Sequence, residues 1–204
     1  TSCFDMPNTS PLTTSGDALE AKFRLASEKC HVNYSFFPGA TNSNSAFLSQ
    51  LDSHRVPGIK LFMGSSTGNM LVDKERALDE IFALAAGMGV PLMAHCEDTA
   101  TITRNMAAMK EQLHTDDPPV ALHAAIRSEE ACVESTRLGI AMARKHHTRF
   151  HLAHVSTASE LLMLGQCAND GVSPTVTGEV CVPHLLFTLD DLKTLGSRVK
   201  CNPA

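Results

Sequence analysis

Short apolar runs alternate with longer helical patterns along this 204-residue chain. A buried parallel strand has a continuous apolar sequence, because helices cover both faces of the sheet. This alternation favours a parallel sheet with right-handed crossovers, and its regularity favours a barrel over an open sheet. Six units are present, whereas a complete (β/α)8 barrel has eight. We therefore expect a single partial barrel over residues 1–204, a fragment that lacks the first and last units.

The boundaries of the expected elements follow from apolar periodicity and from the Pro, Gly, Ser and Thr residues that interrupt it. The segment 98–120 is long for a βα connection, so we expect a helical excursion followed by a loop there. The expected strands are 1–5, 31–37, 58–63, 91–95, 149–155 and 172–182, the expected helices are 17–29, 45–51, 73–88, 128–145, 157–167 and 190–195, and 64–69 is an expected loop.

Composition excludes several kinds of partner. The chain is 43% hydrophobic, which is enough for one substantial core. Its net charge is -5 with the two signs mixed along the sequence, so no basic surface for nucleic acid or anionic lipid is expected. No apolar run approaches the length of a membrane span, and the first residues lack a signal-peptide pattern. We expect a cytoplasmic protein whose partner is a small molecule.

Three of the apolar runs carry a residue able to hold a metal ion near their carboxyl ends: Lys60, His95 and His154. Chemistry in (β/α)8 barrels gathers at this end of the strands, and neutral imidazole is a common zinc ligand. His151 competes with His154, but residues three apart on a strand point to opposite faces. We therefore expect only His154 to face the barrel interior. A structural role remains the alternative for each lone histidine.

Lys60 is the least expected of these residues, because a charged lysine inside an Ile-Lys-Leu-Phe run is costly to bury. Burial disfavours the ammonium form and lowers the lysine pKa. The side chain can reach the rim of the barrel or pair with a carboxylate. Alternatively, the neutral amine can capture carbon dioxide as a carbamate, an anionic ligand able to bridge two metals. The sequence pattern leaves these alternatives open.

Several neighbouring residues have two interpretations. The seven cysteines form no CxxC pair, which fits a reducing compartment, and Cys96 should point away from His95 because adjacent strand residues alternate. Glu97 and Asp98 can orient a metal ligand or simply favour a helix N-terminus. Arg127 can pair with an acid or touch substrate. His184 follows a proline, so we expect it in a turn with a structural role.

An ordered set of motifs spanning essentially the whole chain resembles the dihydroorotase family. This family belongs to the cyclic amidohydrolases, which include dihydropyrimidinase and allantoinase. Each motif alone is modest, whereas the set in this order is specific. The motifs are Asp5-Met-Pro-Asn-Thr9, Gly58-Ile-Lys-Leu-Phe-Met-Gly64, Ala94-His-Cys-Glu-Asp98, His151-Leu-Ala-His-Val-Ser-Thr157, the run 178–188 and Lys200-Cys-Asn-Pro-Ala204.

The resemblance implies a hydrolase with two zinc ions that interconverts N-carbamoyl-L-aspartate and L-dihydroorotate in pyrimidine biosynthesis. Lys60 matches the carboxylated lysine that bridges the metals, and His95 and His154 match the histidine pair on the second metal. Asn8 and Asn202 match residues that bind the substrate's carboxylate and ring amide. The loop containing Asn8 favours dihydroorotase, because the substrate of dihydropyrimidinase has no free carboxylate.

The resemblance also implies groups that this chain does not contain. They are a His-x-His pair with a neighbouring Arg before the first strand, and a proton-shuttling Asp after the last. The adjacent pair His146 and His147 lies among basic residues at a helix end and is expected to be solvated. We expect the isolated chain to be inactive and to bind metal weakly, and expect homo-oligomerisation or further chain to cover its open edges. A sister cyclic amidohydrolase and a non-catalytic dihydroorotase-like structural subunit are the alternatives.

Overall fold

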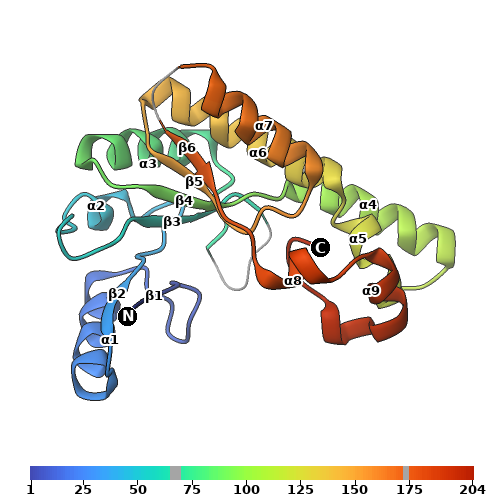
Figure 1. The fold of residues 1–204 in the computed structure, drawn as a ribbon, viewed down its shortest axis with the longest axis horizontal. Coiled ribbons are helices and arrows are strands. Elements are labelled where there is room, and N and C mark those ends of the chain that lie inside the picture. The colour runs from blue at the N-terminus through green and yellow to red at the C-terminus, as the bar shows by residue number, and fades with distance from the viewer. Residues whose placement is uncertain (65–69, 172–174) are drawn as a thin grey trace.

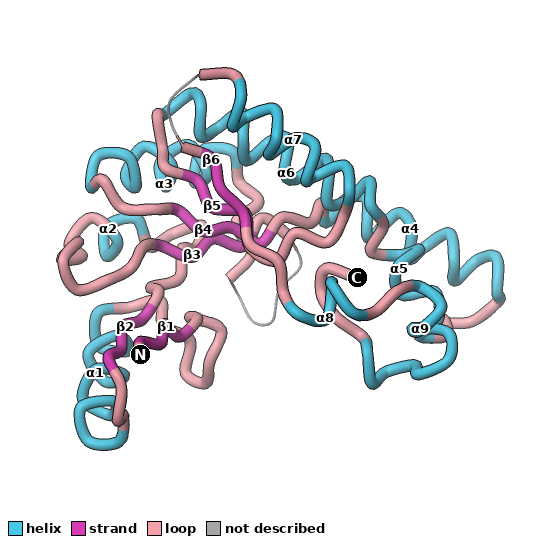
Figure 2. The backbone as a smooth tube through the Cα atoms, viewed as in Figure 1, coloured by secondary structure: helices cyan, strands magenta, loops and turns pink. Residues whose placement is uncertain are grey.

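The computed structural model describes residues 1–64, 70–171 and 175–204. All of its paired strands run parallel, and they follow one another in chain order. A two-stranded sheet is followed by a four-stranded sheet, and an isolated parallel bridge from Gly39 to Lys60 connects the two (Figure 2). The strands are β1 (Ser2–Asp5), β2 (Asn33–Phe36), β3 (Ile59–Phe62), β4 (Leu92–His95), β5 (Phe150–Leu152) and β6 (Val176–Gly178).

Helices cover one face of the four-stranded sheet, where α3, α6 and α7 lie side by side (Figure 1). None of the described helices is long and apolar enough to cross a membrane. The helices are α1 (Gly16–Lys29), α2 (Ser45–Leu48), α3 (Glu75–Met88), α4 (Thr99–Leu113), α5 (His123–Ile126), α6 (Glu129–His146), α7 (Ala158–Asn169), α8 (Val182–Leu186) and α9 (Leu189–Leu195).

The two faces of the four-stranded sheet have different roles. Side chains alternate along a strand, so one set of residues packs against the helices in the main hydrophobic core. The other set faces away from α3 and α6, and we call this side the inner face of the sheet. In register there, Lys60 pairs with Met93, Met93 with His151, and His151 with Thr177. The sheet therefore has an apolar helix-facing side and an inner face that carries the chemically active groups.

Most predicted elements are present, and the differences have local causes. The predicted strand 149–155 ends at Leu152. Among the described residues of the predicted strand 172–182, only Val176–Gly178 form a strand, and Val182 begins α8, where Pro183 in the first turn favours a helix start. The predicted helix 157–167 corresponds to α7, and Thr157 caps its N-terminus in a capping box with Glu160. Residues 65–69 of the predicted loop, and residues 172–174, lie outside the described residues.

Gly64 lies where the chain leaving β3 approaches the chain leaving β4. A Cβ atom at this position would be 1.8 Å from the Glu97 carbonyl oxygen. We predict that Gly64→Ala lowers the free energy of unfolding by about 1–3 kcal/mol or more, because a backbone atom cannot move aside cheaply. Urea unfolding measures the loss. Gly87→Ala is the matched control, since nothing lies within 4 Å of its Cβ position on α3 and alanine should stabilise that helix. Equal effects of the two substitutions would contradict the prediction.

Candidate metal centre

Lys60 lies on β3 with its side chain on the inner face of the sheet, and it is 3% exposed. Its Nζ has no hydrogen-bond partner among the described residues and lies 4.6 Å from the centre of the Phe62 ring. Burial lowers the pKa of Lys60 to about 8. A lysine with this pKa exists partly as the neutral amine near neutral pH, and only the neutral amine can react with carbon dioxide.

His95 and His154 point toward each other across the ends of β4 and β5. The Nδ1 atom of His95 lies 3.1 Å from the Nε2 atom of His154, with the rings inclined at 74°. Two nitrogens bound to one tetrahedral zinc ion are about 3.3 Å apart, given Zn–N bonds of about 2.0–2.1 Å. The pair of nitrogens therefore fits a shared metal ion, and the partnerless Lys60 amine is a third group suited to a centre of this kind.

The environment of His154 favours its neutral form. Burial lowers the pKa of this imidazole to about 3, and the positive charges of His95 and Lys60 act in the same direction. Neutral imidazole is the form that binds metals. No group of three His, Cys, Asp or Glu side chains within the described ranges is placed to hold a metal ion. The two histidines therefore depend on Lys60 or on additional ligands to complete a site.

The orientation of His154 differs from the prediction. Because β5 ends at Leu152 and His154 has a left-handed backbone with φ of 42°, strand alternation does not extend to this residue. His151 shares the inner face with Met93, and its Nδ1 lies 2.8 Å from the Thr177 hydroxyl. The prediction that only one of the two histidines faces inward is therefore wrong. His154 meets His95 through a backbone turn.

Lowering the pH should decrease the free energy of unfolding, because the fold keeps His154 neutral. In the unfolded chain its pKa is near 6.5, whereas in the fold it is about 3, so between these values only the unfolded state is protonated. Stability therefore falls as the pH decreases from 6.5 toward 3, by up to about 1.4 kcal/mol per pH unit from this residue. We predict that His154→Asn, which tolerates the left-handed backbone, reduces this slope in urea unfolding series. The same substitution at the exposed His54 is the control, and equal slopes for the wild type and His154→Asn would contradict the prediction.

Glu97 and Arg127 form a buried ion pair behind His95, which the sequence pattern did not distinguish from a helix-terminus effect. Glu97 is fully buried, and its Oε2 atom lies 2.8 Å from Nε2 of His95. Arg127 donates from Nε to Oε1 at 2.9 Å and also from Nη2 to Oε2. Burial opposes ionisation of Glu97, but His95 and Arg127 outweigh it and hold the pKa of this carboxyl below its usual value. The sequence signal for this contact was that Glu97 lies two residues after His95, a spacing that places both side chains on the same face of a strand.

Cys96 points to the helix side, as predicted. It is buried in the main core, and its thiol lies 3.9 Å from the Met63 sulfur. Burial raises the pKa of the Cys96 thiol to about 12, so the thiolate needed for nucleophilic attack or metal binding is disfavoured. The side chain is a core residue next to the site.

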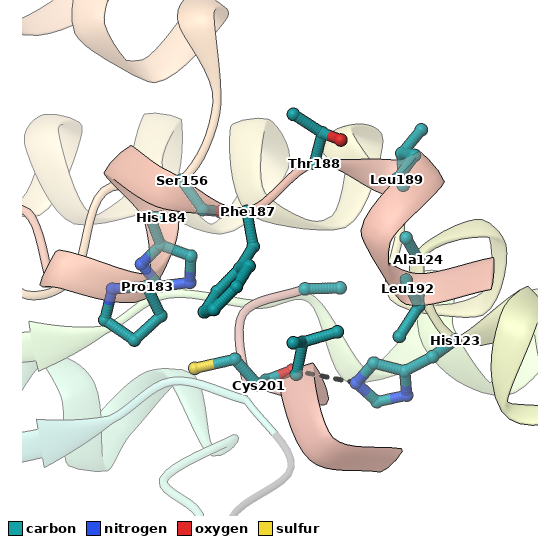
Figure 3. Close-up of a pocket in the computed structure, with 12 residues that line it drawn as sticks. His123, Ala124, Ser156, Pro183, His184, Phe187, Thr188, Leu189, Leu192 and Cys201 are labelled. Carbon is teal, nitrogen blue, oxygen red and sulfur yellow. Dashed lines mark hydrogen bonds between the residues drawn. The ribbon is translucent and has the colours of Figure 1, made fainter. Parts of the chain in front are cut away.

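Within the described part of the chain, neither predicted substrate-binding asparagine forms a hydrogen bond with Lys60, His95 or His154. Asn8 is exposed in the loop after β1. The Oδ1 atom of Asn202 lies 2.9 Å from Nε2 of His123. The same Nε2 lies 2.8 Å from the Cys201 carbonyl oxygen (Figure 3). His123 and Cys201 line a cavity of about 230 Å³ that also contains Ser156, two residues beyond His154. Asn202 is therefore held beside a cavity that reaches the segment following β5.

No family model matches the chain. An allantoinase from Bacillus velezensis is 31% identical over 205 residues, which cover 100% of this chain and 44% of that protein. A dihydroorotase from Methanosphaera stadtmanae is 27% identical over 205 residues with the same coverage. The chain is related to the cyclic amidohydrolases. It spans less than half the length of the curated relatives it matches, and most of those are named allantoinase.

Solved structures of cyclic amidohydrolases support the fold. An L-hydantoinase from Arthrobacter aurescens matches with a TM-score of 0.91 at 23% identity, over 100% of this chain and 44% of that chain. The predicted fold class, a partial (β/α)8 barrel, is confirmed. The amidohydrolase resemblance is confirmed at the level of the wider group, because allantoinases and a dihydroorotase match over the same residues.

Proposed function

We propose that residues 1–204 form part of the single catalytic barrel of a metal-dependent hydrolase that opens or closes a cyclic amide. The observation that carries this proposal is the convergence of three groups. The nitrogens of His95 and His154 lie 3.1 Å apart, and the buried Lys60 amine, which has no hydrogen-bond partner among the described residues, is near enough to lower the pKa of His154. His95 is the last residue of β4, His154 follows β5, and Lys60 lies within β3.

Each of the three residues has a defined role in this proposal. The Lys60 amine would form an N–C bond with carbon dioxide and release one proton, which would give an anionic carbamate able to hold metal. His95 and His154 would add the nitrogen ligands Nδ1 and Nε2. Metal bound by these residues would supply an activated water and a Lewis acid for the amide carbonyl. The chain's own contribution is to orient these ligands, to keep His154 neutral, and to lower the pKa of Lys60 to about 8 so that part of its amine is neutral.

Two substrates are candidates, each with its own support. L-dihydroorotate is favoured by the loop containing Asn8 and by Asn202, whose amides suit a carboxylate and a ring amide. Allantoin is favoured by the names of most relatives, including the one at 31% identity. Both reactions cleave one C–N bond of a cyclic amide with one water, so the same metal centre serves either. The surrounding loops determine the choice between them.

The test is hydrolysis by the complete polypeptide that carries this chain, loaded with zinc. L-dihydroorotate, allantoin and dihydrouracil are supplied separately, and ring opening is followed by absorbance or chromatography. We expect turnover of dihydroorotate or allantoin, and a loss of at least about 100-fold in His95→Ala and His154→Ala. Turnover of dihydrouracil alone would reject both substrate assignments. Zinc binding without any turnover would support the non-catalytic subunit.

A further inference from the structure

We propose that Glu97 and Arg127 are positioning residues that fix the ring orientation and the tautomer of His95, so that Nδ1 is the atom presented to the metal. This inference rests on the proposed function for its biological meaning. Its geometric basis is independent of that function, because the ion pair and its contact with His95 are present without metal. The inference concerns which nitrogen of His95 carries the proton.

The position of the proton follows from electrostatics. The Oε2 atom of Glu97 lies 2.8 Å from Nε2 of His95, and the carboxylate is fully buried. A bare imidazole nitrogen would place its lone pair against a carboxylate oxygen, which is repulsive in a buried environment. The contact does not have the angles of a hydrogen bond, but the repulsion alone favours the tautomer with the hydrogen on Nε2 and the lone pair on Nδ1. Nδ1 is also the atom that faces His154, at 3.1 Å.

Arg127 keeps this carboxylate ionised and in place. It follows α5 and contacts both oxygens of Glu97, and a forked guanidinium held in this way allows little rotation of the carboxylate. The backbone on either side is also fixed. The carbonyl of Glu97 packs against Gly64, and Asp98 caps α4 by accepting from the Thr101 amide at 2.7 Å. The carboxylate is therefore held in one position, and it fixes the orientation of the His95 ring.

Glutamine at position 97 should reverse the preference. Arg127 only donates hydrogen bonds, so the amide oxygen of the new side chain should turn toward it. The amide nitrogen then faces His95 and donates to Nε2. An Nε2 atom that accepts a hydrogen bond leaves the proton on Nδ1, where it blocks the metal-binding position.

The matched control is Glu160→Gln. Glu160 is also a buried carboxylate, at 2% exposure, but it lies on α7 and accepts from the Thr136 hydroxyl at 2.9 Å. Its substitution removes the same charge from the same protein without changing a contact of His95. A general effect of losing a buried carboxylate would appear in both variants.

Nitrogen-15 NMR of the histidine-labelled, metal-free protein tests the inference. Two-bond proton–nitrogen spectra at a pH of about 8.5, above the ordinary imidazole range, distinguish the two tautomers. We expect the Nε2–H form of His95 in the wild type and in Glu160→Gln, and the Nδ1–H form in Glu97→Gln. An Nδ1–H form in the wild type would overturn the inference, and so would an unchanged tautomer in a folded Glu97→Gln protein. The wild-type spectrum gives this answer even if the variant does not fold.

Zinc affinity links the tautomer to the proposed centre. Equilibrium dialysis of the complete polypeptide should show zinc binding about 10–100-fold weaker in Glu97→Gln than in Glu160→Gln. Loss of the tautomer preference with unchanged zinc affinity would overturn the metal-positioning role. The expected tautomers in a protein that hydrolyses no cyclic amide would reject the proposed function while retaining the positioning pair.

Discussion

Arg127→Met is expected to lower the free energy of unfolding by about 3–5 kcal/mol, the cost typical of removing one partner from a buried ion pair. Glu97 has no exposed surface, so its charge cannot be solvated once the guanidinium is gone. Methionine retains much of the apolar volume of the arginine stem, which limits the loss from packing. Urea unfolding at neutral pH, monitored by circular dichroism, measures the change.

An exposed ion pair provides the control for Arg127→Met. Arg76 on α3 is 91% exposed and contacts Glu80 one turn later at 2.9 Å. Because water solvates both charges, Arg76→Met should cost less than about 0.5 kcal/mol. The double variant Glu97→Gln with Arg127→Met should recover part of the loss, since no uncompensated charge is then buried. Similar small losses in Arg127→Met and Arg76→Met would show that the buried pair does not stabilise the fold.

The barrel strands were predictable where burial is complete on both faces. Both β3 and β4 fall within one or two residues of the predicted runs, because every residue in them is buried and apolar runs record that burial. The region around β6 was predicted poorly. Its strand has only three partly exposed residues, so no continuous apolar run distinguishes it from the loop before α8.

The site was predictable in its residues more than in its geometry. Lys60 and His95 lie on regular strands, so their inward direction follows from alternation. His154 lies beyond its strand at a positive φ, which no sequence pattern for a residue other than glycine signals reliably. Arg127 reaches Glu97 across 30 residues through tertiary packing alone. The pairing of His123 with Asn202, 79 residues apart, was unpredictable for the same reason.

Lys60→Met should stabilise the metal-free protein while it removes the bridging ligand of the proposed centre. The Lys60 amine is buried without a hydrogen-bond partner, and methionine fills similar space with no charge to desolvate. The pKa of Lys60 falls from 10.5 to about 8 on folding, which corresponds to a stability cost of about 3 kcal/mol below pH 8. The variant should gain a comparable free energy of unfolding at neutral pH.

The pH dependence shows whether Lys60→Met stabilises the fold by removing a buried charge or by packing better. Between pH 8 and 10.5 the unfolded chain holds a proton on Lys60 that the folded chain has released, so wild-type stability rises through this range relative to Lys60→Met. The advantage of the variant should therefore be largest below pH 8 and disappear near pH 10.5.

Lys193→Met, at a side chain that is 64% exposed, should change stability by less than about 0.5 kcal/mol. A Lys60→Met protein that is less stable than the wild type at pH 7, or that binds zinc equally well, would show that Lys60 is a structural residue. A gain in stability coupled to a loss of zinc binding is the behaviour expected of a residue kept for its chemistry despite the cost of burying it.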